Sequence, residues 1–190
     1  MTRRKIRLPS PPSISHRLAS WGWDYLVILG WLLLVFLLVG LPQILDWIDL
    51  TPVWTDQNSA DAGITILTVL PYFAYLFLTE LKRPHATWGK RKAGIVVAGR
   101  DEAPLRGGSV LIRNLVKVMP WQLGHMGTMR LATTSEVTTT AIALEVSSLT
   151  LLALIVVPIF LRRRGVHDLL AGTQVTTTRG PGTRPAIPSL

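Results

Sequence analysis

The stretch RLASWGWDYLVILGWLLLVFLLVGL, residues 17–41, decides the fold of this chain. Its last seventeen residues, 25–41, carry no charge, and about 20 mostly apolar residues suffice for a helix to cross the hydrocarbon core of a bilayer. Arg17 and Asp24 stand at its start, seven positions apart, so on a helix they lie on nearly the same face, roughly 10 Å apart along the axis. The stretch therefore predicts a membrane-spanning helix with two charged groups at its entrance.

Asp24 is the unusual residue of this helix, because it lies at or just inside the hydrocarbon boundary. An ionisable side chain at that depth is costly, and it is commonly either functional or paired with another charge. The alternative is that Arg17 and Asp24 are ordinary boundary charges whose side chains extend into the headgroup layer. The spacing by itself leaves both interpretations open.

The composition indicates a polytopic membrane protein. Of the 190 residues, 48% are hydrophobic and the net charge is +9. The basic residues flank the apolar blocks instead of forming a stripe interleaved with aromatic residues, so the charge is typical of cytoplasmic loops that contact anionic lipid headgroups, and not of a nucleic-acid-binding protein. The absence of cysteine excludes disulfides, thiol catalysis and thiolate metal sites.

Four segments are candidates for crossing the membrane. We expect spans at about 18–45, 62–81 and 140–161, together with a weaker third span at 109–131. Residues 1–13 and 176–190 are rich in proline, serine, threonine or basic residues, so we expect disordered tails there. The loop 82–108 contains seven basic residues and is expected in the cytoplasm, with a small hairpin formed by the strand-like run 95–98 and the turn that follows it.

The segment 109–131 allows two interpretations. Its first turns form an amphipathic helix, with Arg113 and Lys117 on the polar face, which is typical of a helix lying flat on the membrane surface. The positive-inside rule favours a span, because only four spans place the N-terminus, the loop 82–108 and the cluster 162–164 on the same cytoplasmic side. We therefore predict an all-α bundle of four transmembrane helices, multi-pass in the inner (plasma) membrane, with both termini in the cytoplasm.

Four separated segments of this sequence resemble the RDD family of bacterial membrane proteins. The family is named for an arginine at the start of its first helix, an aspartate within that helix and an aspartate after its last span. Arg17, Asp24 and Asp168 match these three positions. Asp168 lies in RRGVHDLLAGT, residues 163–173, and two further blocks also fit: ATWGKRKAGIVV, residues 86–97, and LIRNLVK, residues 111–117. The resemblance covers about residues 14–175. The sequence departs from the family pattern at Lys92, where an apolar residue is usual, and in the long polar stretch 122–140.

The resemblance implies a membrane domain of poorly defined function. For some members of the family, transport of ions or small solutes by cation/proton exchange has been proposed, and here Asp24 would be the exchanging carboxylate. Other members accompany enzymes or further domains, which implies an accessory or assembly role in a larger membrane complex or a homo-oligomer. In that case Arg17, Asp24, Asp168 and Arg113 would form a structural ion-pair network.

Three further residues are secondary candidates for such a site. Glu145 lies about one turn inside the last span, His167 precedes Asp168, and Lys90 belongs to the basic block 86–97. His125 and His167 titrate in the range suited to proton relay, but neither has a carboxylate at metal-ligand spacing, so we expect no metal and no cofactor. Since the sequence lacks a nucleophile triad, a phosphate loop and a zinc-protease helix, we expect that the protein is not an enzyme.

Overall fold

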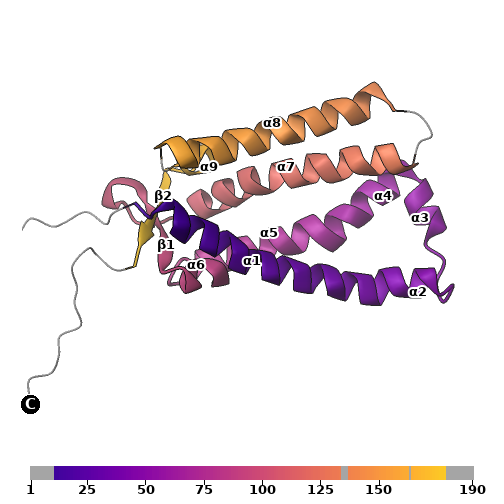
Figure 1. Ribbon diagram of the computed structural model, residues 1–190, viewed down its shortest axis with the longest axis horizontal. Helices are drawn as coiled ribbons and strands as arrows, with labels where there is room; N and C mark the ends of the chain where they lie inside the picture. The colour runs from indigo at the N-terminus through magenta and orange to yellow at the C-terminus, as the bar shows by residue number, and fades with distance from the viewer. Residues whose placement is uncertain (1–10, 134–136, 163, 179–190) are drawn as a thin grey trace, which may run out of the picture.

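The computed structural model describes residues 11–133, 137–162 and 164–178. Figure 1 shows an elongated bundle in which long helical segments run side by side and a small two-stranded sheet lies at one end. Its first membrane-length segment consists of α1 (Ile14–Val35), the π-helical turn η1 (Phe36–Gly40) and α2 (Leu41–Ile44). Its second consists of α4 (Gln57–Ile64), the π-helical turn η2 (Thr65–Val69) and α5 (Leu70–Leu81), and follows the short helix α3 (Thr51–Thr55).

The second half of the chain contributes two long helices and several short elements. The long helices are α7 (Gly107–Thr133) and α8 (Thr139–Arg162), which run antiparallel to each other and are in contact along their lengths (Figure 1). The short elements are α6 (Trp88–Lys92), β1 (Ile95–Gly99), the 3-10 turn η3 (Arg100–Glu102), α9 (Val166–Leu170) and β2 (Thr173–Thr177).

Three segments among the described residues are long and apolar enough to cross a membrane: Ile14–Ile44, Gln57–Leu81 and Thr139–Leu161. They coincide with the predicted spans 18–45, 62–81 and 140–161. The predicted weak span 109–131 falls within α7, which is 27 residues long but is not one of the three. This helix continues through Pro120 and packs against α4, α5 and α8, so it runs along the bundle and not across its end.

Prolines account for the π-helical turns. Pro42 and Pro71 each follow such a turn closely. Proline has no N–H and its ring crowds the carbonyl four residues earlier, so the helix must rearrange there. In the second span the carbonyl of Leu67, four residues before Pro71, accepts a hydrogen bond of 2.7 Å from the indole Nε1 of Trp31 on α1. The carbonyl that Pro71 leaves without its helical donor thus has a partner on α1.

The helices have few buried apolar residues, as expected when lipid covers the outside of a bundle. Val69, Leu76 and Val118 form a small core between α5 and α7, with Tyr72 and Phe73 packed against it. The most apolar window of the first span has no buried residue at all. Instead, the buried residues of α1 are polar, namely Arg17, Ser20 and Asp24, and their spacing puts them on one face.

The predicted hairpin within residues 82–108 is wrong. Strand β1 pairs antiparallel with β2, which lies more than seventy residues later, so that Val97 faces Val175. The turn after β1 is occupied by η3, and residues 103–106 then connect it to α7. An isolated two-stranded ribbon is marginally stable in water, and here the alternate residues Ile95 and Val97 are buried beneath it.

Both predicted tails include residues that belong to the folded domain. Pro12 is fully buried and the hydroxyl of Ser13 caps α1, so the predicted tail 1–13 ends too late. The predicted tail 176–190 starts too early, because Thr176 and Thr177 belong to β2. Residues 1–10 and 179–190 lie outside the described residues.

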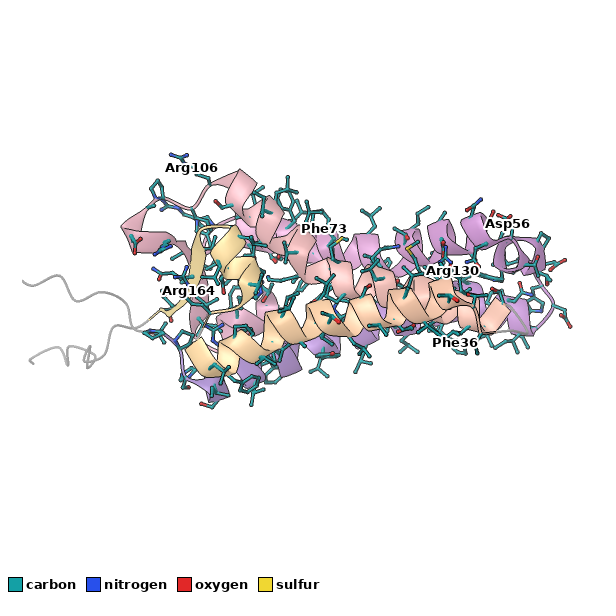
Figure 2. The ribbon with its side chains drawn as sticks, turned by 90° about the horizontal axis from the view of Figure 1, so that it is seen from above. Phe36, Asp56, Phe73, Arg106, Arg130 and Arg164 are labelled. Atoms are coloured by element: carbon teal, nitrogen blue, oxygen red, sulfur yellow. The ribbon has the colours of Figure 1, made fainter. Side chains whose placement is uncertain are left out.

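The two ends of the bundle differ in charge. We call the end that carries α6, α9, β1 and β2 the basic end, and the end that carries α2 and α3 the acidic end. Figure 2 shows Arg106 and Arg164 at the basic end and Asp56 at the acidic end. Four aspartates lie near the acidic end: Asp46, Asp49, Asp56 and Asp61.

Candidate functional site: a buried ion-pair network at the basic end

Asp24 is held by the first residues of α6. Its Oδ2 accepts a hydrogen bond of 2.7 Å from the hydroxyl of Thr87, and its Oδ1 accepts one of 2.8 Å from the backbone N–H of Gly89. The hydroxyl of Tyr75 on α5 donates a third, also to Oδ1, at 2.7 Å. The carboxylate therefore joins α1, α5 and α6 and lies where the free N–H groups of a helix start favour an anion.

Gly89 permits this close approach. A Cβ atom at this position would lie 2.2 Å from the backbone carbonyl oxygen of Ser20 and 2.7 Å from Cγ of Asp24. No side chain other than hydrogen fits between α1 and α6. Trp88, the preceding residue, packs edge-on against Trp23 of α1 at 5.4 Å between ring centroids, which extends the contact outward. The sequence TWG, residues 87–89, thus supplies a hydroxyl and a backbone N–H to Asp24 and an aromatic ring to Trp23.

Glu80, at the end of α5, is the centre of a second network. Its Oε1 accepts from Nζ of Lys90 at 3.0 Å and from Nζ of Lys117 at 2.9 Å. Its Oε2 accepts from Nε of Arg113 at 3.1 Å and from Nδ2 of Asn114 at 3.2 Å. The residue is 0% exposed, so four donors from α6 and α7 surround a carboxylate without solvent.

Arg113 carries the network onward to the C-terminal segment. Its NH1 donates to Oδ1 of Asp168 and, at 3.1 Å, to the hydroxyl of Thr173. The hydroxyl of Thr173 in turn donates to Asp168 at 2.9 Å. Because Asp168 is on α9 and Thr173 opens β2, one guanidinium connects α5 and α7 to the part of the chain that follows the last span.

His167 is buried beside these charges. Its Nε2 lies 3.5 Å from Oδ2 of Asp168, and its ring packs against the backbone of Gly165. Burial is the main effect that lowers the pKa of His167 well below its usual value, and the nearby cations Arg113 and Lys117 lower it further. The imidazole is therefore neutral near pH 7.

Lys90 joins the two networks. Its Nζ contacts both Glu80 and, at 3.3 Å, the hydroxyl of Thr87 that binds Asp24. A continuous set of polar contacts thus runs from Asp24 through Thr87 and Lys90 to Glu80. Such a buried network specifies one arrangement of helices, although burying the charges offsets much of its gain in stability.

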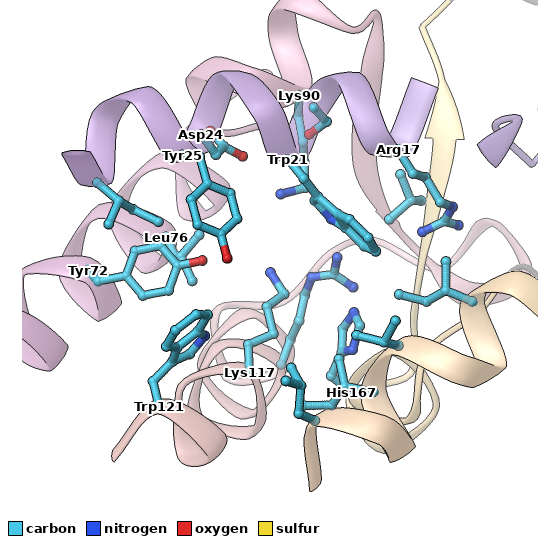
Figure 3. A pocket seen from close by; sticks show the side chains of 18 of the residues that line it. Arg17, Trp21, Asp24, Tyr25, Tyr72, Leu76, Lys90, Lys117, Trp121 and His167 are labelled. Carbon is cyan, nitrogen blue, oxygen red and sulfur yellow. The ribbon is translucent and has the colours of Figure 1, made fainter. Parts of the chain in front are cut away.

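A cavity of about 340 Å³ adjoins the networks. Arg17 and Ser20 of α1 line it, opposite Lys117 of α7 and His167 of α9. Figure 3 shows Lys90 and Lys117 reaching toward its middle from opposite sides, with the rings of Trp21 and Tyr72 beside them. This is the place where the sequence-predicted Arg17, Asp24, Lys90, Arg113 and His167 meet.

With this geometry established, comparison with known proteins gives one assignment. The model of the RDD family matches residues 11–172, which is most of the chain. The chain belongs to the RDD family. No curated protein and no solved structure matches it.

In this RDD protein the three residues predicted to match the name of the family lie at one end of the bundle. Arg17 and Asp24 share a face of α1, and Asp168 lies on α9. Asp24 and Asp168 do not share a bond. Asp24 binds hydroxyl and amide groups, whereas Asp168 binds Arg113. Glu145 lies in the half of α8 near the acidic end, where it accepts from the hydroxyl of Thr128 at 2.9 Å, so it is not part of the network.

Glu80 and Lys117 are central to the RDD network, and sequence reasoning assigned them smaller roles. The sequence predicted Lys117 as part of the polar face of one helix, and Glu80 was not among the predicted site residues. The sequence did contain an indication of this role. Arg113 and Lys117 lie four residues apart in the predicted span 109–131, and two cations on one face of a span need acidic partners. Glu80 was the acid closest to the predicted basic end of the neighbouring span.

Within the described residues no group of three or more histidines and acids is placed to hold a metal ion. The acids of the network are separated by the basic side chains that bind them. The site is therefore a set of anions already bound by protein donors beside a cavity with a cationic wall.

Proposed function

We propose that this RDD protein is a non-transporting accessory or assembly subunit of a membrane complex, in which the arginine–aspartate cluster fastens the helices together. The observation that carries the proposal is that Asp24 already has three hydrogen-bond donors, from Thr87, Gly89 and Tyr75. A cation or proton that exchanged at this carboxylate would have to displace contacts joining three helices.

We further propose that α7 is a fourth span and that the basic end faces the cytoplasm of a plasma-membrane protein. The course of α7 alongside α8, over much of the length of the bundle, supports a span. Its charged residues have partners inside the bundle: Arg113 and Lys117 bind Glu80, and Arg130 binds Asp61 at 2.7 Å. These pairs lower the cost of placing a poorly apolar helix in lipid. The gathering of basic residues at one end supports the orientation.

The test compares stability and flux in the same preparations. In the accessory role, Asp24→Asn and Thr87→Val each weaken one end of the same hydrogen bond. We expect both to lower the melting temperature, and the double variant to lose less than the sum of the two single losses, because the residues are in contact. Asp101→Asn is the matched control, since that carboxylate is at the basic end but its side chain is 83% exposed.

The flux arm uses liposomes loaded with a pH-sensitive dye, a proton gradient, and Na⁺, Li⁺ or K⁺ added outside. The accessory proposal expects no cation-dependent dissipation by folded wild type. Dissipation by wild type and Asp101→Asn, but not by folded Asp24→Asn, would contradict it and establish Asp24 in an exchange path.

Ion transport is the second candidate function, because polar contacts follow α7 through the apolar part of the bundle. Gln122 donates to the hydroxyl of Thr65 at 2.9 Å. One turn further along, His125 lies 3.4 Å from the hydroxyl of Thr68. These groups lie between the network at the basic end and the Arg130–Asp61 pair. If the flux arm is positive, His125→Gln and Gln122→Leu should each reduce the rate.

A further inference from the structure

The cavity at the basic end has a cationic wall. Four of its lining residues are basic, namely Arg17, Lys90, Arg113 and Lys117, and among the described lining residues Asp24 is the only acid. Asp24 already accepts three hydrogen bonds, and Glu80 lies behind the lysines and not on the cavity surface. The space therefore presents an excess of positive charge and fits an anion.

Donors remain available to such an anion. An ammonium group has three N–H donors. Of these, Lys117 uses two within the described part of the chain, to Glu80 and Asn114, and Lys90 uses two, to Glu80 and Thr87. Both side chains reach into the cavity (Figure 3).

The hydroxyl of Ser20 is a further polar group in the cavity wall that a ligand could bind. Its side chain lines the cavity, the residue is 1% exposed, and its hydroxyl has no hydrogen-bond partner among the described residues. A buried hydroxyl without a partner costs free energy comparable to a lost hydrogen bond. A ligand oxygen in the cavity would satisfy it.

An apolar cavity of about 560 Å³ adjoins the cationic one. The two share Tyr25, Ile28, Tyr72 and Trp121 in their linings. The second lies between α1, α5 and α7, where its wall is formed largely by aliphatic and aromatic side chains of the spans. The residues that α1 contributes to it, 25–32, extend roughly 10 Å along the helix axis.

We propose that these two adjoining cavities form one binding site for an anionic lipid, with its phosphate in the cationic cavity and an acyl chain in the apolar one. Arginine binds a phosphate through two parallel N–H donors and lysine binds it as a point charge. Arg17, Lys90, Lys117 and Ser20 supply these groups on three sides of the same space. The apolar cavity selects for a chain, because inorganic phosphate would leave it empty.

The experiment measures ligand-induced shifts in melting temperature of the delipidated full-length protein in a neutral detergent. The probes are dioleoyl phosphatidic acid, dioleoyl phosphatidylcholine and sodium phosphate. A ligand that binds only the folded state stabilises it in proportion to the logarithm of its concentration over Kd. We expect saturable stabilisation by phosphatidic acid, with affinity at least tenfold above that for phosphatidylcholine and far above that for phosphate.

The variants separate the two halves of the site. Arg17→Gln should weaken phosphatidic acid binding by about tenfold, the effect of one lost charged contact of about 1.4 kcal/mol. Ala74→Leu fills the apolar cavity, which Ala74 lines, without touching the cationic one. It should weaken binding of the lipid and leave any weak effect of phosphate unchanged. Arg106→Gln, an exposed basic residue at the same end, is the control and should bind as wild type does.

Three results would overturn the proposal. Equal affinity for phosphatidylcholine would remove the anion requirement, and equal stabilisation by phosphate would remove the acyl chain. Loss of affinity in Arg106→Gln as large as in Arg17→Gln would indicate nonspecific attraction to the basic end. If Arg17→Gln fails to fold, Ser20→Ala replaces it, because deleting an unpartnered hydroxyl does not break a protein contact; the expected loss is then about threefold to tenfold.

Discussion

Replacing Glu80 by glutamine should destabilise this protein more than any other single charge-neutralising change at the basic end. The Glu80 carboxylate is fully buried and accepts hydrogen bonds from four side chains, those of Lys90, Arg113, Asn114 and Lys117. Glutamine keeps the shape of the side chain, but it has one acceptor oxygen and an NH₂ group that is itself a donor. Two donors would therefore face another donor, and two lysines would lose their counter-charge.

The magnitude follows from the cost of uncompensated buried charge. Removing one partner of a buried ion pair costs about 3–5 kcal/mol. Arg113 keeps Asp168, which limits the loss on its side of the network. For a chain of this length about 1 kcal/mol shifts the melting temperature by 2–4 °C, so we expect Glu80→Gln to melt about 6–20 °C below wild type.

The assay is thermal unfolding in detergent, followed by the fluorescence of the seven tryptophans. Lys117→Met in the Glu80→Gln background removes one of the unpaired cations and should recover part of the loss, whereas Lys117→Met alone should destabilise. A melting temperature of Glu80→Gln within 2 °C of wild type, as expected for Asp101→Asn, would refute the view that the network holds the helices together.

Three further changes test separate parts of the structure. Gly89→Ala should push α6 away from α1, because its Cβ would lie 2.2 Å from the carbonyl oxygen of Ser20, and near-ultraviolet circular dichroism of the tryptophans should change with a fall in melting temperature. Acidification from pH 7.5 to 5.5 should lower the free energy of unfolding through His167 by up to about 1.4 kcal/mol, because its pKa is lowered on folding from 6.5 and the unfolded chain takes up the proton first. Trp31→Phe removes the donor to the carbonyl of Leu67 and should cost about 1 kcal/mol, measured by chemical unfolding.

Each of these has its own control. Gly22→Ala is the counterpart of Gly89→Ala, since no atom lies within 4 Å of a Cβ at that position. His167→Gln should reduce the loss of stability between pH 6.5 and 5.5, and an unchanged pH profile would contradict the assignment to this residue. Trp47→Phe is the match for Trp31→Phe, because Trp47 is 74% exposed. Equal losses of stability in both variants would show that the contact with the carbonyl of Leu67 does not stabilise the protein.

Periodicity and the positions of charge predicted the long helices of this protein well. The charge-free run after Asp24 and the apolar block before the arginines 162–164 can only be accommodated in lipid or in a core, so their element type and limits follow from composition. The helix α7 was harder to predict as a span. Its cations Arg113 and Lys117 pair with Glu80 on α5, whereas a hydropathy average counts the charges of α7 without the partners that neutralise them.

The pairing of β1 with β2 could not be read locally. A run such as IVVAG, residues 95–99, indicates a strand, but the identity of a partner more than seventy residues away depends on how the helices between them fold. The same holds for Glu80, since its importance comes from donors on α6 and α7. The hydrogen bonds from Thr87 and Gly89 to Asp24 could be predicted only in part. Residues 87–89 were recognised as part of a motif, but their contact with α1 could not be read from the sequence.

The pairing of the last strand with the first has a consequence for the order in which the protein is built. Thr173 and Asp168 complete the set of acceptors around Arg113, and both are made after all the long helices. Until those residues leave the ribosome, Arg113 has only Glu80 to share with Lys90 and Lys117. The basic end therefore closes only after the long helices have been synthesised, and a nascent chain halted before residue 168 would have those helices but lack both of these acceptors.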